Sequence, residues 1–401
     1  MLDRQESFCD AVSNLWSMEN SEQPRLFIDH FAQITDPRIH RQRKHDLIDI
    51  LFCAICSVLC GAEDCVAMAD FARGRLAWLR QFVPMRGGPP SHDTFSRVFS
   101  LLNPGPLHEC FIQWTQTIQT ITQGEVIALD GKTVRHSFDT ATDKSAIHMV
   151  SAWGAANGLV LGQVKVESKS NEITAIPQLL KMLDIQGCIV TIDAMGTQKQ
   201  IAAQIVEQQG DYVLCVKDNH PSLFADVVAF FERSHQDRFL DGEAEPIFHT
   251  SHTTRDADHG RIETRTCIAS DILDQIPASA DWANLRSIVE LTSERISSGK
   301  TTTQKRYYIT SLPADAKSIL AAVRSHWRVE NSLHWVLDVT FDEDQRRNRL
   351  GHGPENLSVL RHIAINLCKS NTTRKASVNR KRNMAAWEPE FLTELITNRK
   401  I

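Results

Sequence analysis

The chain has 401 residues, of which 42% are hydrophobic and 23% charged, a composition typical of globular proteins with room for two or three domains. Its formal net charge of −5 argues against a protein that binds nucleic acid through overall charge, although the basic residues are unevenly spread. The most apolar stretch, residues 47–62, is too short to span a bilayer comfortably and contains Asp49, so we expect a buried helix and no membrane association.

The N-terminal sequence MLDRQESFCD is polar and does not look like a secretory signal. Ten cysteines without such a signal indicate free thiols in a reducing compartment, which predicts a cytoplasmic protein. Cys53, Cys56 and Cys60 fall at i, i+3 and i+7 of the expected helix, and Cys65 follows shortly after. No second ligand pair completes a zinc site, so we favour packing over metal binding for these four residues.

Residues 1–120 are predicted to form a helical N-terminal domain. Apolar periodicity predicts helices at 47–62, 66–83, 94–103 and 107–121. A basic segment, DPRIHRQRKHD, precedes the first of them, and its Arg41, Arg43 and Lys44 are candidates for phosphate contact. Helices joined by short turns beside a basic segment suit a DNA-binding module or a packing domain, and the pattern leaves both open.

From residue 124 the pattern changes to strands. We expect strands at 125–130, 188–194 and 211–217, and a hairpin over 148–166 that turns at Asn157-Gly158. Helices are expected at 171–183, 197–210 and 221–234. The order β, β, β, α, β, α, β, α is that of a ribonuclease-H-like α/β fold, a mixed sheet flanked by helices.

Two of these strands end on a carboxylate, Asp130 and Asp193. In the expected topology the first and fourth strands are parallel neighbours about 4.8 Å apart, so the two carboxylates converge at the sheet edge. A lone buried charge is costly, and a shared cation such as Mg²⁺ accounts for both side chains. Two divalent ions held in this way can activate the attacking oxygen and stabilise the leaving oxygen of a phosphodiester.

Residues 245–311 are predicted to be a β-rich insertion, and residues 314–339 the last strong helix. This helix offers Glu330 as a third carboxylate, with Asp338 as a rival two turns further on. His326, Glu330 and His334 share a helix face, but the HExxH pattern of zinc proteases is absent. Trp327 and Trp335 suit base stacking or core packing, and we favour the core.

Several motifs together resemble one family. They are ALDGK, VESKSNEITAIP, TIDAMGTQ, YVLCVKDNHPSL, HGRIETR and HWRVENSLHWVLDVTFDED. In order along the chain, they are similar to the DDE insertion-sequence transposases, and most of all to the H-repeat-associated kind found beside Rhs elements. Two segments, 45–84 and 90–104, resemble the N-terminal associated domain of that family.

The resemblance implies a catalytic domain at residues 121–370 and two aspartates and a glutamate that bind Mg²⁺, with Mn²⁺ able to substitute. These positions correspond to Asp130, Asp193 and Glu330. Related transposases carry Tyr-x₂-Arg-x₃-Glu-x₆-Lys around the glutamate, from which this sequence departs. Val323, His326 and Leu337 stand at the Tyr, Arg and Lys positions, and Arg324, Arg328 and His334 are candidates to serve instead.

The implied activity is the cutting and joining of double-stranded DNA at the ends of a mobile element and at its target, carried out at the bacterial nucleoid, with a homodimer left open. The alternatives are a catalytically silent DNA-binding descendant and a nuclease of the same fold without strand transfer. We expect residues 371–401 to form a basic tail. The remaining candidates for DNA contact are Lys132, Arg135, Lys217, Asn219, Arg261, Arg324 and Arg328.

Overall fold

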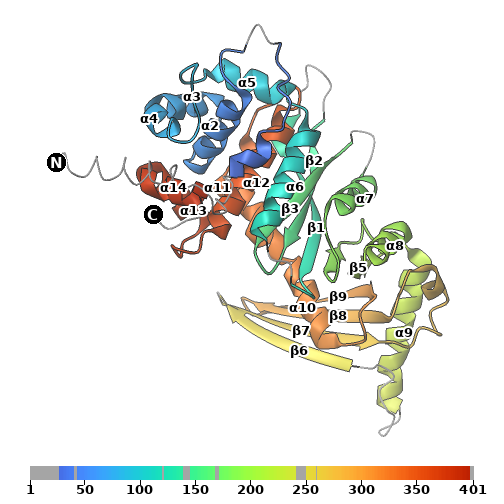
Figure 1. The fold of residues 1–401 in the computed structure, drawn as a ribbon. Coiled ribbons are helices and arrows are strands. Elements are labelled where there is room, and N and C mark those ends of the chain that lie inside the picture. The colour runs from blue at the N-terminus through green and yellow to red at the C-terminus, as the bar shows by residue number, and fades with distance from the viewer. Residues whose placement is uncertain are drawn as a thin grey trace, which may run out of the picture.

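The computed structural model describes residues 27–39, 43–119, 122–138, 145–167, 171–240, 250–258 and 260–397. Its centre is a nine-stranded mixed sheet in the order β3-β2-β1-β4-β5-β9-β8-β7-β6 (Figure 1). The strands are β1 (Val126–Thr133), β2 (His148–Gly154), β3 (Leu159–Val166), β4 (Ile189–Ile192), β5 (Asp211–Val216), β6 (Thr250–Asp258), β7 (Arg261–Ser270), β8 (Ser287–Ser297) and β9 (Lys300–Thr310). The predicted mixed α/β class is confirmed.

The three parallel strands lie at the heart of this sheet. β1 pairs with β4 in parallel, with Leu129 opposite Ile192, and β4 pairs with β5 in parallel. β2 and β3 add antiparallel strands on the other side of β1. The expected adjacency of the first and fourth strands is therefore present. The expected end of the first strand at Asp130 is wrong, because β1 continues beside β2 to Thr133. The ladder between β1 and β4 ends at Leu129 and Ile192, directly before the two aspartates.

Strands β6 to β9 continue the same sheet instead of forming a separate one. β9 pairs antiparallel with β5, and β8, β7 and β6 follow in antiparallel hairpin order. In Figure 1 these long strands extend the sheet away from the N-terminal helices. The region expected as a β-rich insertion is thus part of the central sheet.

Helices cover both faces of the sheet, because strand residues that are buried on both sides need apolar cover on each. Val213 and Cys215 face α10, whereas Leu214 and Val216 belong to the main core on the opposite face. The helices of this region are α7 (Glu172–Met182), α8 (Lys199–Glu207), α9 (Pro221–Leu240), α10 (Ala316–His326), the π-helical segment η5 (Glu330–His334), α11 (Trp335–Thr340) and α12 (Gly353–Ser370).

The predicted single helix over 314–339 is interrupted. α10 ends at His326, and a π-helical segment from Glu330 to His334 precedes α11. A π-helical turn inserts one residue into the helical repeat and often marks a functional site. The predicted helix over 66–83 is also divided, into α3 (Cys65–Gly74) and α4 (Leu76–Leu79).

The first and last parts of the chain pack together. The described N-terminal residues form the short 3-10 helix η1 (Phe27–Phe31), α2 (Leu47–Leu59), α3, α4, α5 (His92–Leu101) and α6 (Pro104–Ile118). Residues expected as a basic tail contain α13 (Val378–Trp387) and α14 (Pro389–Thr397), which pack against α2 and α12 (Figure 1). Lys381 and Arg382 are buried there. In the described part of the chain, no helix is long and apolar enough to span a membrane.

Candidate active site

Asp130 and Asp193 lie at matching positions of two adjacent parallel strands. Leu129 and Ile192 are partners in the β1–β4 ladder, and each aspartate directly follows one of them. Because parallel neighbours are about 4.8 Å apart, this register places both carboxylates at one edge of the sheet. The sheet topology therefore determines their proximity.

The environment of Asp130 shows which other carboxylates are close. The pKa of Asp130 is raised to about 7, chiefly by burial and in addition by the negative charges of Asp193, Glu172 and Glu330. The backbone N–H of Gly131, which donates to Asp130 Oδ1 at 2.9 Å, acts in the opposite direction. The three carboxylates predicted from the sequence thus share one electrostatic environment, together with a fourth.

The turn after β4 fixes Asp193. Its Oδ1 accepts a hydrogen bond from the N–H of Met195 at 3.1 Å. Thr197 Oγ1 donates to the Asp193 carbonyl at 3.1 Å and to the Cys215 carbonyl at 2.6 Å, which ties the turn to β5. Asn219 Nδ2 donates to the Ala194 carbonyl at 2.6 Å. Asn219, expected to contact DNA, therefore supports the backbone that carries Asp193.

The π-helical segment presents Glu330 and His334 to this edge. Glu330 is exposed at the first position of the segment, and His334 at the last position brings Nδ1 to 3.5 Å from Asp130 Oδ2. The pKa of His334 is lowered to about 4, chiefly by burial and in addition by the positive charge of Lys132. His334 is therefore a neutral imidazole near pH 7, suited to donating a hydrogen bond to the Asp130 carboxylate.

Glu172 is the carboxylate that the sequence analysis missed. It is the first residue of α7, and its Oε1 lies 2.6 Å from His148 Nε2, while His148 Nδ1 lies 2.8 Å from Thr133 Oγ1. A methyl group at residue 131 would collide with both Glu172 and His148. The only sequence signal was the placement of Glu172 at the start of the helix after the third strand.

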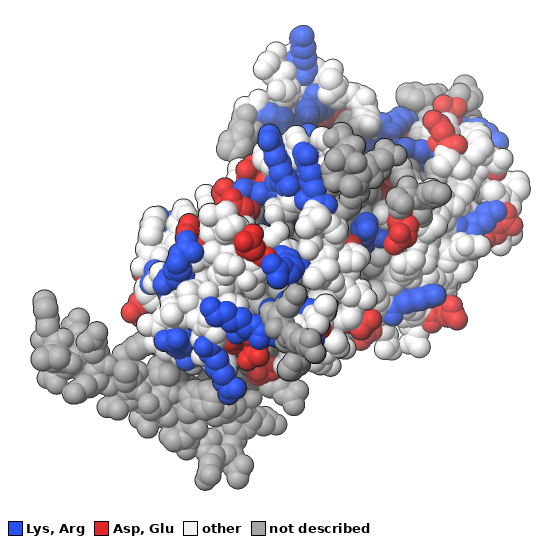
Figure 2. Space-filling model, turned by 90° about the horizontal axis from the view of Figure 1, so that it is seen from above, with Lys and Arg blue, Asp and Glu red and all other residues white. Residues whose placement is uncertain are grey.

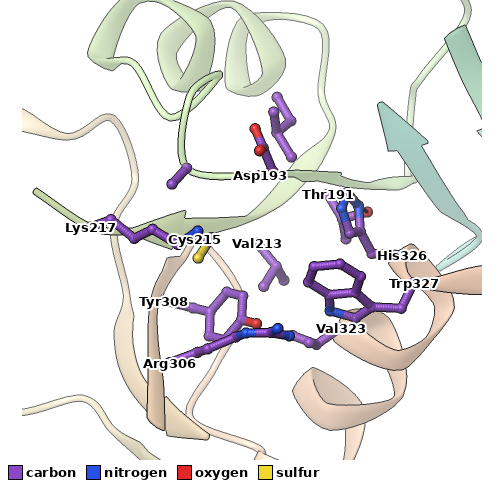
Figure 3. A pocket seen from close by; sticks show the side chains of 12 residues that line it. Thr191, Asp193, Val213, Cys215, Lys217, Arg306, Tyr308, Val323, His326 and Trp327 are labelled. Atoms are coloured by element: carbon purple, nitrogen blue, oxygen red, sulfur yellow. Dashed lines mark hydrogen bonds between the residues drawn. The ribbon is translucent and has the colours of Figure 1, made fainter. Parts of the chain in front are cut away.

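A small cavity of about 50 Å³ opens beside Asp193 on the α10 face of the sheet (Figure 3). Apolar side chains line most of it, and Arg306, Lys217 and Trp327 supply charge and an aromatic face. The Arg306 guanidinium lies 4.4 Å from the centre of the Trp327 ring. His326 Nδ1 lies 3.0 Å from Thr191 Oγ1, and burial lowers the pKa of His326 to about 4.

The preference for core packing of the two tryptophans is wrong. Trp327 is 36% exposed and Trp335 is 55% exposed. The helix instead buries the apolar residues at the other positions of its repeat, Ile319, Val323 and Leu333. Both indole rings are therefore accessible to a ligand, and that of Trp327 lines the cavity beside Asp193.

The donor set at this edge suits a hard divalent cation. Carboxylate oxygens are the preferred protein ligands of Mg²⁺, which completes its shell with water and substrate oxygens. The raised pKa of Asp130 reflects its burial first and the neighbouring carboxylates second, and a bound cation would stabilise the ionised form against both. Over the described residues, no three Asp, Glu, His or Cys side chains already surround a single point as ligands.

Two of the candidates for DNA contact form ion pairs with carboxylates of this chain. Lys132 Nζ lies within 3.3 Å of carboxylate oxygens of Asp338, Glu343 and Asp344. Arg135 Nε lies 3.2 Å from Asp344 Oδ2, although its side chain is largely exposed.

Three further candidates for DNA contact, Arg43, Arg324 and Arg261, also interact with other residues of this chain. Arg43 donates to the backbone carbonyl of Arg38 at 2.7 Å. Arg324 pairs with Asp256 at 2.9 Å, and the Arg261 guanidinium lies 3.8 Å from Glu263.

The remaining candidates that the structure describes are exposed to solvent. Lys44, Lys217 and Arg328 are exposed, and Arg41 lies outside the described residues. On the face seen in Figure 2, Lys and Arg side chains stand in several small groups with Asp and Glu between them. On this face, contact with a phosphate backbone would therefore rest on separate basic groups.

Comparison with known proteins places this site in context. The family model described as "Transposase DDE domain" matches residues 121–367, and that described as "DDE_Tnp_1-associated" matches residues 28–115. "Putative transposase YncI" of Escherichia coli O157:H7 is 40% identical over 92% of this chain and 94% of its own length. "H repeat-associated putative transposase YhhI" of Escherichia coli K12 is 39% identical over 93% of this chain and 98% of its own length.

One solved structure is a weaker match. A piggyBac transposase synaptic complex with hairpin DNA aligns with a TM-score of 0.45 and 13% identity, over 92% of this chain and 76% of that one.

Proposed function

Because this chain belongs to the DDE transposases, in their H-repeat-associated group, we propose that it cuts and joins DNA at the ends of an insertion-sequence-like element. The observation that carries the proposal is the position of Asp130 and Asp193, each of which directly follows the last residue pair of the parallel β1–β4 ladder. The order of β1 to β5, with three antiparallel strands followed by two parallel ones, supports a ribonuclease-H-like catalytic domain.

Asp130, Asp193 and Glu330 are the residues that would hold Mg²⁺, or Mn²⁺ in its place. Bound as a pair, such cations would neutralise charge on a phosphodiester and favour attack on its phosphorus by water or by a 3′ hydroxyl, with departure of the bridging oxygen of the cleaved strand. The protein positions the reacting groups. The Met195 N–H orients Asp193, and the neutral His334 orients Asp130.

Exposed side chains around this edge would hold the DNA. Lys217 lies at the mouth of the cavity beside Asp193, and Trp327 and Trp335 offer flat apolar surfaces. Phosphates favour the lysine, and unpaired bases stack on indole rings with little sequence preference. The helical region at 28–115 would recognise the ends of the element.

The experiment is metal-dependent cleavage of a supercoiled plasmid that carries the flanking sequences of the gene. Wild type, Asp193→Asn and a surface control, Asp70→Asn, are compared with Mg²⁺, with Mn²⁺ and with chelator. Asp70 is exposed on α3 and pairs there with Arg73. We expect cleavage by wild type and the control, and none by Asp193→Asn or with chelator. Cleavage that survives in Asp193→Asn would contradict the proposal.

A second candidate is a catalytically silent DNA-binding protein. Val323 and Leu337 occupy the positions where related transposases carry Tyr and Lys, and both are buried, so neither can contact a phosphate. Tight and specific binding to the flanks without cleavage in either metal would favour this candidate.

A further inference from the structure

Lys132 lies two residues beyond Asp130 on β1, and its side chain points to the same face of the strand. Its Nζ is 2.7 Å from Asp338 Oδ1, 3.3 Å from Glu343 Oε2 and 3.1 Å from Asp344 Oδ1. The side chain is only 11% exposed. A single ammonium group therefore contacts three carboxylates that lie more than 200 residues further along the chain.

The helix that carries Glu330 contacts β1 at two points. His334, in the π-helical segment, contacts Asp130, and Asp338, one turn further on in α11, contacts Lys132. The two residues on the strand are two positions apart, and the two residues on the helix are four positions apart. Two contacts of this kind fix the position of the helix along the strand and also the rotation of the helix about its own axis.

The turn at residues 341–346 is held from its other side as well. The buried Glu343 also accepts a hydrogen bond from Arg361 Nη1 at 3.0 Å, which joins the turn to α12. Arg346 Nη1 lies 2.9 Å from Glu63, which joins it to the N-terminal region. The turn thus contacts α12, the N-terminal region and β1, and Lys132 makes the contact with β1, the strand that carries Asp130.

We propose that Lys132 is a positioning residue that sets the place of Glu330 relative to Asp130. This inference rests on the proposed function, since it assigns a role within the same site. Without the ammonium group, Asp338, Glu343 and Asp344 repel one another, and α11 moves away from β1. Glu330 then no longer stands where a cation held by Asp130 and Asp193 can reach it.

The test is Mn²⁺ affinity, measured from the electron paramagnetic resonance signal of free Mn²⁺, together with plasmid cleavage. Lys132→Met is compared with Lys132→Arg and with Lys305→Met. Lys305 is the matched control because its Nζ lies 3.0 Å from the buried Glu290, in the part of the sheet formed by β8 and β9. We expect Lys132→Met to weaken Mn²⁺ binding at least tenfold, Lys132→Arg to restore most of it, and Lys305→Met to bind like wild type.

The direction of the change in Mn²⁺ affinity distinguishes a positioning role of Lys132 from a purely electrostatic effect of its charge. Loss of a nearby positive charge by itself tightens cation binding, so unchanged or tighter binding by Lys132→Met would overturn the inference. Equal weakening in Lys305→Met would overturn it too, because general destabilisation then explains the loss. If Lys132→Met does not fold, the double variant Lys132→Met with Asp344→Asn removes one charge of each sign. Near-wild-type affinity of that variant would also overturn the inference.

An Asp130→Asn variant tells this inference apart from the proposed function. If Asp130→Asn binds Mn²⁺ as wild type does, the carboxylate edge is not the metal site, and the proposed function fails together with the inference. If Asp130→Asn loses Mn²⁺ and Lys132→Met keeps it, the proposed function stands and only the positioning role is excluded.

Discussion

The carboxylate of Glu172 occupies the space that a side chain at Gly131 would need. Residue 131 follows Asp130 directly, and His148 holds Glu172 in place from the neighbouring strand. The absence of a side chain at one residue of β1 thus allows a fourth carboxylate to approach the edge where Asp130 and Asp193 meet.

Gly131→Ala is expected to displace Glu172 and to reduce plasmid cleavage at least tenfold. An added methyl group in a filled space costs about 1–3 kcal/mol of unfolding free energy, measurable by urea denaturation. Gly74→Ala is the control, because nothing lies near the added methyl group there. If Gly131→Ala cleaves like wild type, Glu172 has no place in the site.

Asp130→Asn is expected to raise the melting temperature at pH 8 by a few degrees and to leave it nearly unchanged at pH 4. The pKa of Asp130 is raised from 3.8 to about 7 in the folded protein, so the folded state binds more protons than the unfolded state between these values. The contribution of Asp130 to the free energy of unfolding therefore falls as pH rises from 4 to 7. Above pH 7 the total loss is about 4 kcal/mol.

Melting curves of wild type and Asp130→Asn from pH 4 to pH 8, in chelator, test this expectation. A lower melting temperature of the variant at pH 8 would show that the ionised carboxylate is stabilised in the fold and not strained by its neighbours.

Lys44→Gln is expected to weaken DNA binding and to reduce the slope of log affinity against log salt by about 1, as loss of one phosphate contact does. Lys44 is exposed, whereas Arg43 donates to the Arg38 carbonyl and pairs with Asp36. Arg43→Gln should therefore lower stability and leave the slope unchanged. Fluorescence anisotropy at several salt concentrations measures both, and a reduced slope in Arg43→Gln would contradict this division.

Arg382→Met is expected to destabilise the protein by about 2–4 kcal/mol, since it removes a buried guanidinium group that donates hydrogen bonds to carbonyls of two other elements. Arg382 is buried, donates to the carbonyls of Val58 and Thr340, and lies 4.0 Å from the Phe341 ring centre. Arg380→Met, at an exposed position of the same helix, is the control. Equal denaturation midpoints for the two variants would indicate that α13 is not part of the cooperative fold.

Local pattern was sufficient to predict the strands that carry Asp130 and lead to Asp193, because both begin as short apolar runs. It did not predict that β1 continues through Asp130 to Thr133, since the polar residues Gly131 to Thr133 are held in the strand by pairing with β2. The parallel pairing of β1 and β4 followed from the order of elements alone. The break before Glu330 was not predictable in this way. The apolar repeat runs on through residues 327–337 without Pro or Gly, and only tertiary contacts select a π-helical turn there.

The roles of Glu172 and Lys132 depend on contacts that sequence spacing does not reveal. Lys132 stood beside a strand end, where a basic residue suggests phosphate contact, yet Asp344, 212 residues further along, binds it. Glu172 is brought to β1 by the packing of a helix. In both cases the decisive partner comes from another element of the fold.

The pairing of β9 with β5 also determines when the sheet can be completed during synthesis. β5 borders β4, and its outer edge has no partner until residues 300–310 have been synthesised. An uncovered strand edge is a template for pairing with other chains. A chain that ends before residue 300 would lack β9 and Glu330. The strands β1 to β5 and β6 to β8 would then be unconnected, and the exposed edge of β5 would favour aggregation.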